Sequence, residues 1–535
     1  MFEAKISAPA TSAISPVLQI RYSQVASSPV KSESTPKPAS VRVARGESAM
    51  WLRLFKRLES TGSLQSRIRD MLTHAVHEGI LPPGAPVPST RLLAHELGVS
   101  RLTVTRALEH LCDNGLLIAR ARSGHYVSAS ALRGRAVSLA RDGVAGTARS
   151  PSWESRLKLR PGAQRNISKP RDWQTAAYPF IYGQFDASLF PLAQWRECAL
   201  ESMHARAIMH WAPDHIDRDH EPLIDQIQQR LLPARGIWAK REEILVTSGA
   251  QHATFLLAQL LVGPRTMIGM EDPGYPDARN NFLLRTAALR PLAVDAEGLV
   301  VDARLARCRY VYVTPSHQCP TTVTMTLQRR QKLLHYASRH DIVVIEDDHE
   351  SELNFSSQPT AALKSLDTDG RVIYIGSLSK TLAHGLRLGY MVAPVALIAE
   401  LRALRRLMLR HPATNNEHTA ARFIAHGFHE VFVRRLNTAY RERANVMQQA
   451  LRSFLPQAQF RQAQGGSALW VELPAGVDTQ QLAAKALVQG IIIEPGAVFF
   501  AGLRPPARTM RLGYSSIAAD RIAPGIAKLA GLLQR

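Results

Sequence analysis

The sequence of 535 residues has few cysteines, few acidic residues and no long apolar run. Its four cysteines (Cys112, Cys198, Cys308 and Cys319) include no pair at CxxC spacing. This pattern indicates neither a zinc site nor a disulfide scaffold, and no metal is expected. No apolar run approaches the roughly 20 residues that span a bilayer, and the N-terminus has no signal-peptide core. We therefore expect a protein of the reducing cytoplasm with no membrane segment.

The shortage of acidic residues leaves a large positive charge. Lys and Arg number 66 against 44 Asp and Glu, a formal net charge of +22. This imbalance favours a polyanionic partner, and nucleic acid is the first candidate. An arginine-rich enzyme would show the same imbalance, so charge alone does not decide between the two classes. The chain is also too long for a single core, and two or more domains are expected.

Composition divides the chain into four parts. Residues 1–50 are rich in Ser, Ala and Pro and are predicted to be a disordered extension, with Met50 as an alternative start to Met1. Residues 51–130 have a helical pattern that ends in a hairpin-like segment. Residues 131–175 contain ten Arg or Lys against three Asp or Glu and read as a basic flexible linker, either simply solvated or in contact with phosphates. Residues 176–535 alternate short apolar strands with longer helical patterns, which indicates an α/β domain.

The second part contains two helices joined by a short turn. "SLQSRIRDMLTHAVHEGIL" has helical spacing of its apolar residues, and the prolines of "LPPGAPVPS" end that helix. Ser89 is predicted to cap a helix that stops at Gly98, and Ser100 to cap the next, "RLTVTRALEHLCDNG". Two helices around a glycine-containing turn predict a helix-turn-helix.

The helix after Ser100 has two different sides. One side is apolar and is expected to pack inward: Val104, Ala107, Leu108 and Leu111. The other carries Arg101, Thr103 and Thr105, which could face base edges in the major groove of DNA. "LLIARARSGHYVSA" follows and predicts a basic wing with its turn at Ser123-Gly124. The alternative is a small helical packing module with a solvated polar face.

In the fourth part, polar residues follow several predicted strands. "VIYIG" is read as a strand, and Ser377, Ser379 and Lys380 come just past its end, where ligands bind in open α/β sheets. A lysine there could be an ordinary surface cation. The other strand ends favour a functional site.

Three further segments supply complementary chemistry. "IVVIEDDHESE" is a strand ending in acids, and a carboxylate beside a pyridinium nitrogen keeps that nitrogen protonated. "EILVTSGAQHATFLLAQLL" predicts a strand, a glycine turn and a helix whose first amides can bind a phosphate. "EDPGYP" presents an aromatic ring that could stack on a planar cofactor. With Lys380 as an amine and Ser377, Ser379 and Arg387 as phosphate ligands, this set predicts a pyridoxal 5'-phosphate site.

The region "GILPPGAPVPSTRLLAHELGVSRLTVTRALEHLCDNGLL" closely resembles the winged helix of GntR-type bacterial regulators, over about 70 residues. The resemblance implies that Arg91, Ser100, Arg101 and Thr103 contact double-stranded DNA. It also implies that the wing near Gly124 approaches the minor groove.

The rest of the chain resembles the fold-type-I aminotransferases. The segments are "TSGAQHA", "EDPGYPDAR", "YVTPSHQCPTTVTM", "IEDDHESE", "GSLSKTLAHGLRLGYMV" and "MRLGYSS". Their order, after a GntR-type winged helix, is similar to that of the MocR-type transcriptional regulators, from residue 63 to 535. The resemblance implies an α/β large domain, with a mixed, mostly parallel sheet and helices on both faces, and a small α+β C-terminal subdomain.

The same resemblance implies roles for single residues. Lys380 would form the internal aldimine, Asp347 would bond the ring nitrogen and Tyr275 would stack on the ring. Arg511 would grip an effector carboxylate through a bidentate fork. The phosphate would be held by the amides of Gly249, Ala250 and Gln251 together with Ser377, Ser379 and Arg387.

The sequence also departs from that family. His349 stands where the family has a tyrosine near the cofactor phenolate, and an imidazole does not fully replace a phenol. Pro320-Thr321-Thr322 stands where a Pro-Thr-Gly turn is usual, and Cys319 replaces the aromatic residue before that proline. These differences leave the choice of effector and any residual transamination open.

Together these features predict a pyridoxal-phosphate-dependent transcriptional regulator. Its effector would be an amine or amino acid, sensed by external aldimine formation at Lys380. A homodimer would place two winged helices on paired half-sites of an operator. One alternative is an active aminotransferase with an appended DNA-binding domain. The other is a regulator whose large domain has lost the cofactor, against which the presence of Lys380, Asp347 and Arg387 argues.

Overall fold

The computed structural model describes residues 48–57, 62–131, 151–184, 186–356 and 360–533. Contacts within the chain divide it into two compact units, Met1–Ser150 and Pro151–Arg535. The predicted extension lies outside the described residues up to residue 47. The predicted linker lies outside them over residues 132–150, whereas residues 151–175 belong to the second unit.

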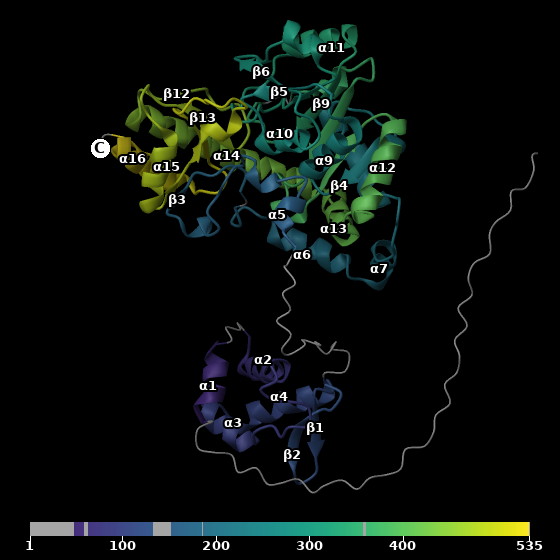
Figure 1. Ribbon diagram of the computed structural model, residues 1–535, viewed down its shortest axis with the longest axis vertical. Coiled ribbons are helices and arrows are strands. Elements are labelled where there is room, and N and C mark those ends of the chain that lie inside the picture. The colour runs from purple at the N-terminus through teal and green to yellow at the C-terminus, as the bar shows by residue number, and fades with distance from the viewer. Residues whose placement is uncertain (1–47, 58–61, 132–150, 185, 357–359, 534–535) are drawn as a thin grey trace, which may run out of the picture. The chain divides into compact units, whose positions relative to one another are not determined.

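The first unit is a small helical domain with a two-stranded wing (Figure 1). Its elements are α1 (Ser48–Arg57), α2 (Leu64–His77), α3 (Thr90–Leu97), α4 (Arg101–Asp113), β1 (Leu117–Arg120) and β2 (Gly124–Val127). The two strands are antiparallel, and Arg120 pairs with Gly124 next to the turn. Helix, turn, helix and wing therefore follow in the order that the sequence predicts.

The boundaries of α3 and α4 arise from side-chain and backbone caps. The Ser89 hydroxyl accepts a hydrogen bond from the Leu92 amide at 3.2 Å, and the Ser100 hydroxyl accepts one from the Thr103 amide at 3.1 Å. Gly98 ends α3 with φ of 66°, a left-handed conformation that a glycine adopts without steric cost. The caps predicted at these three positions are therefore confirmed.

One hydrophobic cluster holds the first unit together. The four apolar residues of α4 predicted to point inward are all buried, against Ile68 and Leu72 of α2. Trp51 and Phe55 of α1 join the same cluster, so the domain's packing begins within α1. Because the apolar side of α4 packs in this core, its opposite side is available to solvent or to a partner.

The second unit is built on an eight-stranded sheet. In spatial order the strands are β4 (Ile244–Thr247), β11 (Gly389–Val392), β10 (Val372–Ser377), β9 (Val343–Asp348), β8 (Tyr310–Val313), β5 (Ile268–Asp272), β6 (Leu289–Asp295) and β7 (Gly298–Leu299). Strands β10, β9, β8, β5 and β6 are parallel, and β11 is antiparallel to both of its neighbours. This confirms the mixed, mostly parallel sheet and brings the carboxyl ends of β4, β5, β8, β9 and β10 to one edge.

Helices cover both faces of this sheet, because successive side chains on a strand point to opposite sides. On β10, Ile373 and Ile375 pack in a cluster with α9 (Ala250–Leu261), α10 (Pro276–Leu283) and α12 (Val395–Leu409). Val372 lies on the other face with α11 (Leu327–Arg339). Tyr374, also on that face, packs with α8 (Glu221–Gln226), α13 (Thr414–Ala425) and α14 (Phe428–Phe454).

A small C-terminal subdomain follows. Its antiparallel sheet consists of β12 (Gln459–Phe460), β13 (Ala468–Glu472), β16 (Thr509–Gly513) and β15 (Glu494–Pro495). Helices α15 (Thr479–Val488) and α16 (Ala519–Leu533) lie beside it (Figure 1), and a two-residue strand, β14 (Ile491–Ile492), pairs with β3 (Tyr178–Pro179). The remaining helices are α5 (Trp153–Arg156), α6 (Leu192–Glu201) and α7 (Ala205–Trp211).

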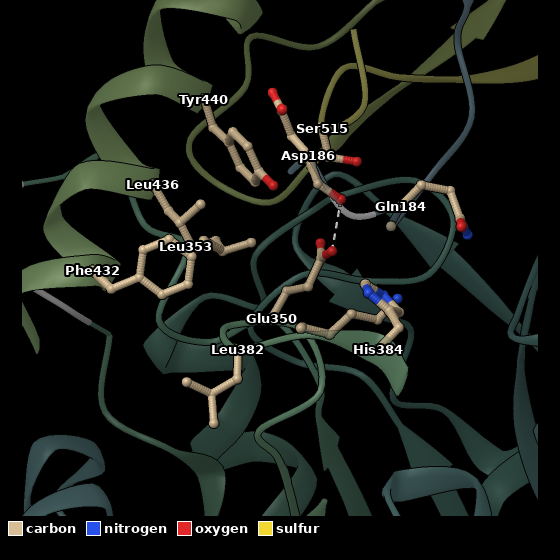
Figure 2. Close-up of a pocket in the computed structure, with 13 residues that line it drawn as sticks. Gln184, Asp186, Glu350, Leu353, Leu382, His384, Phe432, Leu436, Tyr440 and Ser515 are labelled. Carbon is tan, nitrogen blue, oxygen red and sulfur yellow. Dashed lines mark hydrogen bonds between the residues drawn. The ribbon is translucent and has the colours of Figure 1, made fainter. Parts of the chain in front are cut away.

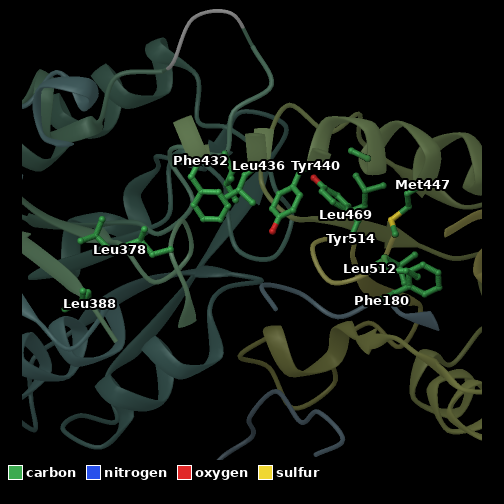
Figure 3. Packing of buried hydrophobic residues seen from close by; sticks show 14 of the residues in the cluster. Phe180, Leu378, Leu388, Phe432, Leu436, Tyr440, Met447, Leu469, Leu512 and Tyr514 are labelled. Atoms are coloured by element: carbon green, nitrogen blue, oxygen red, sulfur yellow. The ribbon is translucent and has the colours of Figure 1, made fainter. Parts of the chain in front are cut away.

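Helix α14 joins the two parts of the second unit. Figure 3 shows its residues Phe432, Leu436, Tyr440 and Met447 in one continuous layer of buried side chains. The layer extends from Leu378 to Phe180 beside the small sheet. Among the helices that the structure describes, none is long and apolar enough to cross a membrane.

Candidate functional site

The carboxyl ends of the sheet strands surround a cavity of about 290 Å³. Every residue predicted to hold the cofactor lines it except Gly249, which immediately precedes two of the lining residues. The lining residues are Tyr182, Ala250, Gln251, Tyr275, Asp277, Cys319, Asp347, His349, Ser377, Ser379, Lys380, His384 and Arg387. Side chains more than two hundred residues apart in the sequence therefore meet in one place.

Lys380 lies just after β10 and carries the amine of the site. Its Nζ is 4.3 Å from the centre of the Tyr182 ring. Burial lowers the pKa of Lys380 to about 8, although the negative charge of Glu350 acts in the opposite direction. Near physiological pH a larger fraction of this amine is therefore neutral than in a lysine with the ordinary pKa. The neutral form is the nucleophile.

Asp347 is the last residue but one of β9, and only one of its two carboxylate oxygens accepts a hydrogen bond from a described residue. Its Oδ2 accepts a hydrogen bond from the Tyr312 hydroxyl. Its Oδ1 is buried and makes no hydrogen bond to any residue that the structure describes; Nδ1 of His349 is 3.7 Å away. Burial raises the pKa of Asp347. A positively charged N–H donor in the cavity, such as a pyridinium, would satisfy this oxygen and favour its ionised form.

The start of α9 forms the other end of the cavity. Gly249 caps α9 with φ of +85°, and a Cβ at this position would lie 3.0 Å from Nη2 of Arg387. That same Nη2 donates to the Ser248 carbonyl at 3.1 Å. The missing side chain therefore lets a guanidinium lie over a helix N-terminus, where the first amides have no intrahelical acceptor. Such an arrangement suits a phosphate.

Tyr275 stands at the N-cap position of α10, on the cavity wall. Its hydroxyl is 3.1 Å from Oε1 of Gln251 and 3.0 Å from Oδ2 of Asp277. The hydroxyl has one hydrogen and can donate it to either acceptor, Gln251 on α9 or Asp277 on α10. The aromatic ring is therefore positioned before any ligand binds.

Arg511 is placed differently from the other predicted residues. It lies on β16 and is buried, but it does not line the cavity. Its Nε donates to Oε2 of Glu494 at 2.8 Å, and its guanidinium carbon is 3.9 Å from the centre of the Tyr182 ring. Arg511 is therefore not among the residues that line the cavity; its Nε is bound to Glu494, whereas its buried Nη2 has no hydrogen-bond partner among the described residues.

A second, much smaller cavity of about 20 Å³ also has Lys380 in its wall (Figure 2). Figure 2 shows Phe432, Leu436 and Tyr440 on one side, and Glu350 and His384 on the other. The Glu350 carboxylate accepts a hydrogen bond from Ser467 at 2.6 Å. Burial alone would raise the pKa of Glu350, but the charges of Lys380 and other neighbours lower it overall. Glu350 is thus an anionic neighbour of the Lys380 amine.

Sequence reasoning did not assign four of the cavity residues: Tyr182, Asp277, Cys319 and His384. Asp277 and His384 lie inside motifs that point to the site, two residues after Tyr275 and four after Lys380, so their spacing could have found them. Tyr182 has no such signal, because it precedes the sheet and reaches Lys380 only through the fold. Among the described residues, no cluster of His, Cys, Asp and Glu is arranged to hold a metal ion.

In the first unit, the predicted DNA-contacting residues gather on α3, α4 and the wing. Arg91 and Arg101 are exposed, as is Gly124 at the wing with φ of +99°. Thr105 donates its hydroxyl hydrogen to the Arg101 carbonyl at 2.9 Å. This leaves Thr105 only as an acceptor toward a base.

Comparisons with known proteins assign both units. Residues 64–127 match the model of the bacterial regulatory proteins of the gntR family, and residues 188–524 match that of the aminotransferases of class I and II. A solved structure of kynurenine aminotransferase from Pyrococcus horikoshii, in complex with PMP, superposes with a TM-score of 0.66 and 28% identity. It covers 71% of this chain and 98% of that one. The chain thus consists of a GntR-type helix-turn-helix domain joined to an aminotransferase domain of class I and II with the fold-type-I architecture.

Full-length relatives have the same two-part organisation. The HTH-type transcriptional regulator TauR of Rhodobacter capsulatus is 42% identical over 88% of this chain and 97% of its own length. The probable rhizopine catabolism regulatory protein MocR of Rhizobium meliloti is 31% identical over 87% and 93%. The chain belongs to the MocR-type family of transcriptional regulators.

Proposed function

We propose that the cavity around Lys380 binds pyridoxal phosphate and uses it to detect a small amine or amino acid. The observation that supports this most is that the Lys380 amine and Asp347, one oxygen of which has no hydrogen bond to the described residues, line one cavity with the first residues of α9. When bound, the cofactor supplies an aldehyde carbon that primary amines attack. Lys380 supplies the resident amine, and an effector amine would compete with it.

The other cavity residues would position the group. The α9 amides, Ser377, Ser379 and Arg387 would hold its phosphate, and Asp347 would hold the proton of its ring nitrogen. Tyr275 would lie against the ring. His349, 3.7 Å from Asp347, would take the place that a tyrosine has in the wider family.

The response would reach DNA through the first unit. An effector that contacts the resting and the released state of Lys380 differently can shift the chain between two operator affinities. We further propose that the chain acts as a homodimer in the cytoplasm, with two winged helices on paired half-sites of the operator. TauR and MocR are both named as regulatory proteins, which supports a role in transcription but says nothing of the oligomeric state.

The test is Lys380→Ala in the full chain, mixed with pyridoxal phosphate and followed by visible absorbance. We expect the wild type to turn yellow and the variant to lose that absorbance, because Lys380 is the only lysine among the described residues that line the cavity. Lys332→Ala, an exposed lysine on α11, is the matched control and should behave as wild type. Unchanged colour in Lys380→Ala would count against the proposed site.

The same site could also turn over as an aminotransferase. This second function is favoured by the match to the Pyrococcus horikoshii enzyme along 98% of that enzyme's length. An amino donor with an oxoacid acceptor distinguishes the two. More than one product molecule per Lys380 supports turnover, whereas a single stalled conversion supports sensing.

A further inference from the structure

The small cavity of about 20 Å³ lies next to the cavity of about 290 Å³, which we call the cofactor cavity. Among the described residues that line the two, only Lys380 and His384 are common to both. A space of this volume admits one group about the size of a water molecule. An ammonium group has that size, so the charged end of a lysine side chain would fit.

The amine of Lys380 already lies at the wall of the small cavity. A Cβ built at Gly183 would be 2.4 Å from Nζ of Lys380 and 3.7 Å from Nε2 of His384. Gly183 lines the small cavity but not the cofactor cavity, and its φ of +60° is one that glycine adopts without strain. Both nitrogens therefore lie beside one backbone position that has no side chain.

The small cavity contains hydrogen-bond acceptors that are not fully used. Oγ of Ser515 and Nε2 of His384 are buried and have no partner among the described residues; Ser515 as a whole is only 1% exposed. The Glu350 carboxylate accepts a hydrogen bond from Ser467, and a carboxylate can accept about four. Because a lysine ammonium group has three N–H donors, Glu350, Ser515 and His384 could together accept all of them.

The charges around the small cavity favour a cation there. Burial lowers the pKa of Lys380, but the negative charge of Glu350 raises it more than any other charge does. Asp186 also lines the cavity, and its Oδ2 is already bound by Arg443. Burial and nearby positive charges lower the pKa of His384 to about 3, so its imidazole is neutral and one ring nitrogen accepts. The other groups whose charges act on Lys380 are Lys169, Arg511 and Cys319.

The rest of the cavity wall suits the carbon chain of a lysine. Figure 2 shows Phe432, Leu436 and Leu353 on one side of the cavity and Glu350, Ser515 and His384 on the other. A lysine side chain packs its apolar stem against apolar groups while its charged end contacts polar ones. The small cavity offers both kinds of surface to a single side chain.

The three acceptors come from different parts of the second unit. Glu350 follows β9 of the large sheet, and Ser515 follows β16 of the small sheet. His384 comes four residues after Lys380 itself. An ammonium group that binds Glu350 and Ser515 at once therefore connects the large sheet to the small subdomain.

We propose that the amine of Lys380, once an effector has displaced it, is held as an ammonium group in the small cavity by Glu350, Ser515 and His384. This rests on the proposed function, because it concerns the same exchange of amines. In that exchange the effector nitrogen replaces the Lys380 nitrogen on the aldehyde carbon and passes one hydrogen to it. A proton from solvent then completes the ammonium group. The three acceptors are positioning residues, which make the released state differ from the resting state.

The first test locates the amine directly. The full chain is loaded with pyridoxal phosphate and treated with methoxyamine, which takes the aldehyde carbon from Lys380 whatever the natural effector is. In a crystal structure of this complex, Nζ of Lys380 should lie within about 3.2 Å of Ser515 Oγ and of a Glu350 oxygen. An amine that stays in the cofactor cavity, out of reach of both, would overturn the inference.

The second test needs no cofactor. The reaction of Lys380 with acetic anhydride is followed against pH by mass spectrometry of the full chain, since only the neutral amine reacts. Ser515→Ala removes a hydroxyl that has no hydrogen bond to the described residues, so a purely structural Ser515 would leave the pH midpoint unchanged. If Ser515 holds the ammonium group, the midpoint should fall by about one pH unit.

Two further variants make this titration specific. Glu350→Gln should lower the midpoint of Lys380 by more than Ser515→Ala, because a charge is lost as well as an acceptor. Glu352→Gln is the matched control: the same change at a residue that lines neither cavity should leave the wild-type midpoint. Unchanged midpoints in both Ser515→Ala and Glu350→Gln would overturn the inference. A wild type that stays colourless with pyridoxal phosphate would instead refute the proposed function, and the cofactor-free titration would still decide where the free amine is held.

Discussion

The two units of this chain build their functional surfaces in opposite ways. The residues predicted to contact DNA lie between positions 91 and 124, on two helices whose starts are capped by nearby serines and on the wing that follows them. The cavity residues lie between positions 182 and 387 and meet only because parallel strands end at one edge of a sheet. A surface made from one continuous segment depends on local chemistry, whereas a cavity made from strand ends depends on the whole topology.

The strongest test of this division is whether the two units unfold separately. Leu108→Ala leaves a cavity in the core of the first unit and should lower that unit's free energy of unfolding by about 2–5 kcal/mol. Leu256→Ala on α9 should cost a similar amount in the second unit only. Calorimetry of the full chain measures both transitions. If each variant shifted both transitions equally, the units would not be independent.

The affinity for an operator shows whether Arg101 in the first unit recognises a base or only attracts DNA by its charge. Arg101→Ala should weaken specific binding by about 1–3 kcal/mol if the exposed guanidinium reads a guanine edge. The measurement is a titration of a duplex selected by the full chain from a randomised pool, next to a random duplex. Equal loss on both duplexes would mean that Arg101 contacts only phosphate.

The pH dependence of cofactor uptake tests the second unit alone. Because burial lowers the pKa of Lys380 to about 8, its amine is neutral above that pH and increasingly protonated below it. The rate at which cofactor absorbance appears should therefore fall roughly tenfold per pH unit below about 8 and level off above it. Stopped-flow mixing from pH 6 to 10 gives the profile. A midpoint near 10.5 would show that the burial of Lys380 has no such effect.

The smallest effect should come from a local cap. Ser100→Ala removes the hydrogen bond to the Thr103 amide and should cost about 1 kcal/mol of the first unit's free energy of unfolding. Ser100→Asp keeps an acceptor and should recover most of this loss. Chemical denaturation followed by circular dichroism compares the two variants. A loss several-fold larger would mean that Ser100 does more than cap α4.

The sequence alone was sufficient for features whose causes are local. Caps at Ser89 and Ser100, the turn at Gly98 and the inward side of α4 follow from the chemistry of adjacent residues. The strand ends that carry Asp347 and Lys380 were also predictable, since apolar runs followed by polar clusters indicate buried strands. Which of these ends would be neighbours came from resemblance to a family, not from periodicity.

Only the tertiary structure decided the surroundings of Arg511. The resemblance implied that Arg511 grips an effector carboxylate; in the structure its Nε donates to Glu494 and its guanidinium lies against the Tyr182 ring. Glu494 is its register partner on the neighbouring strand β15 of the same sheet, whereas Tyr182 comes from a segment more than three hundred residues earlier in the chain. Caps and turns depend on residues that are adjacent in the chain, so the sequence predicts them. The surroundings of a buried charge depend on which strands pair and which distant segments pack together, so only the tertiary structure shows them.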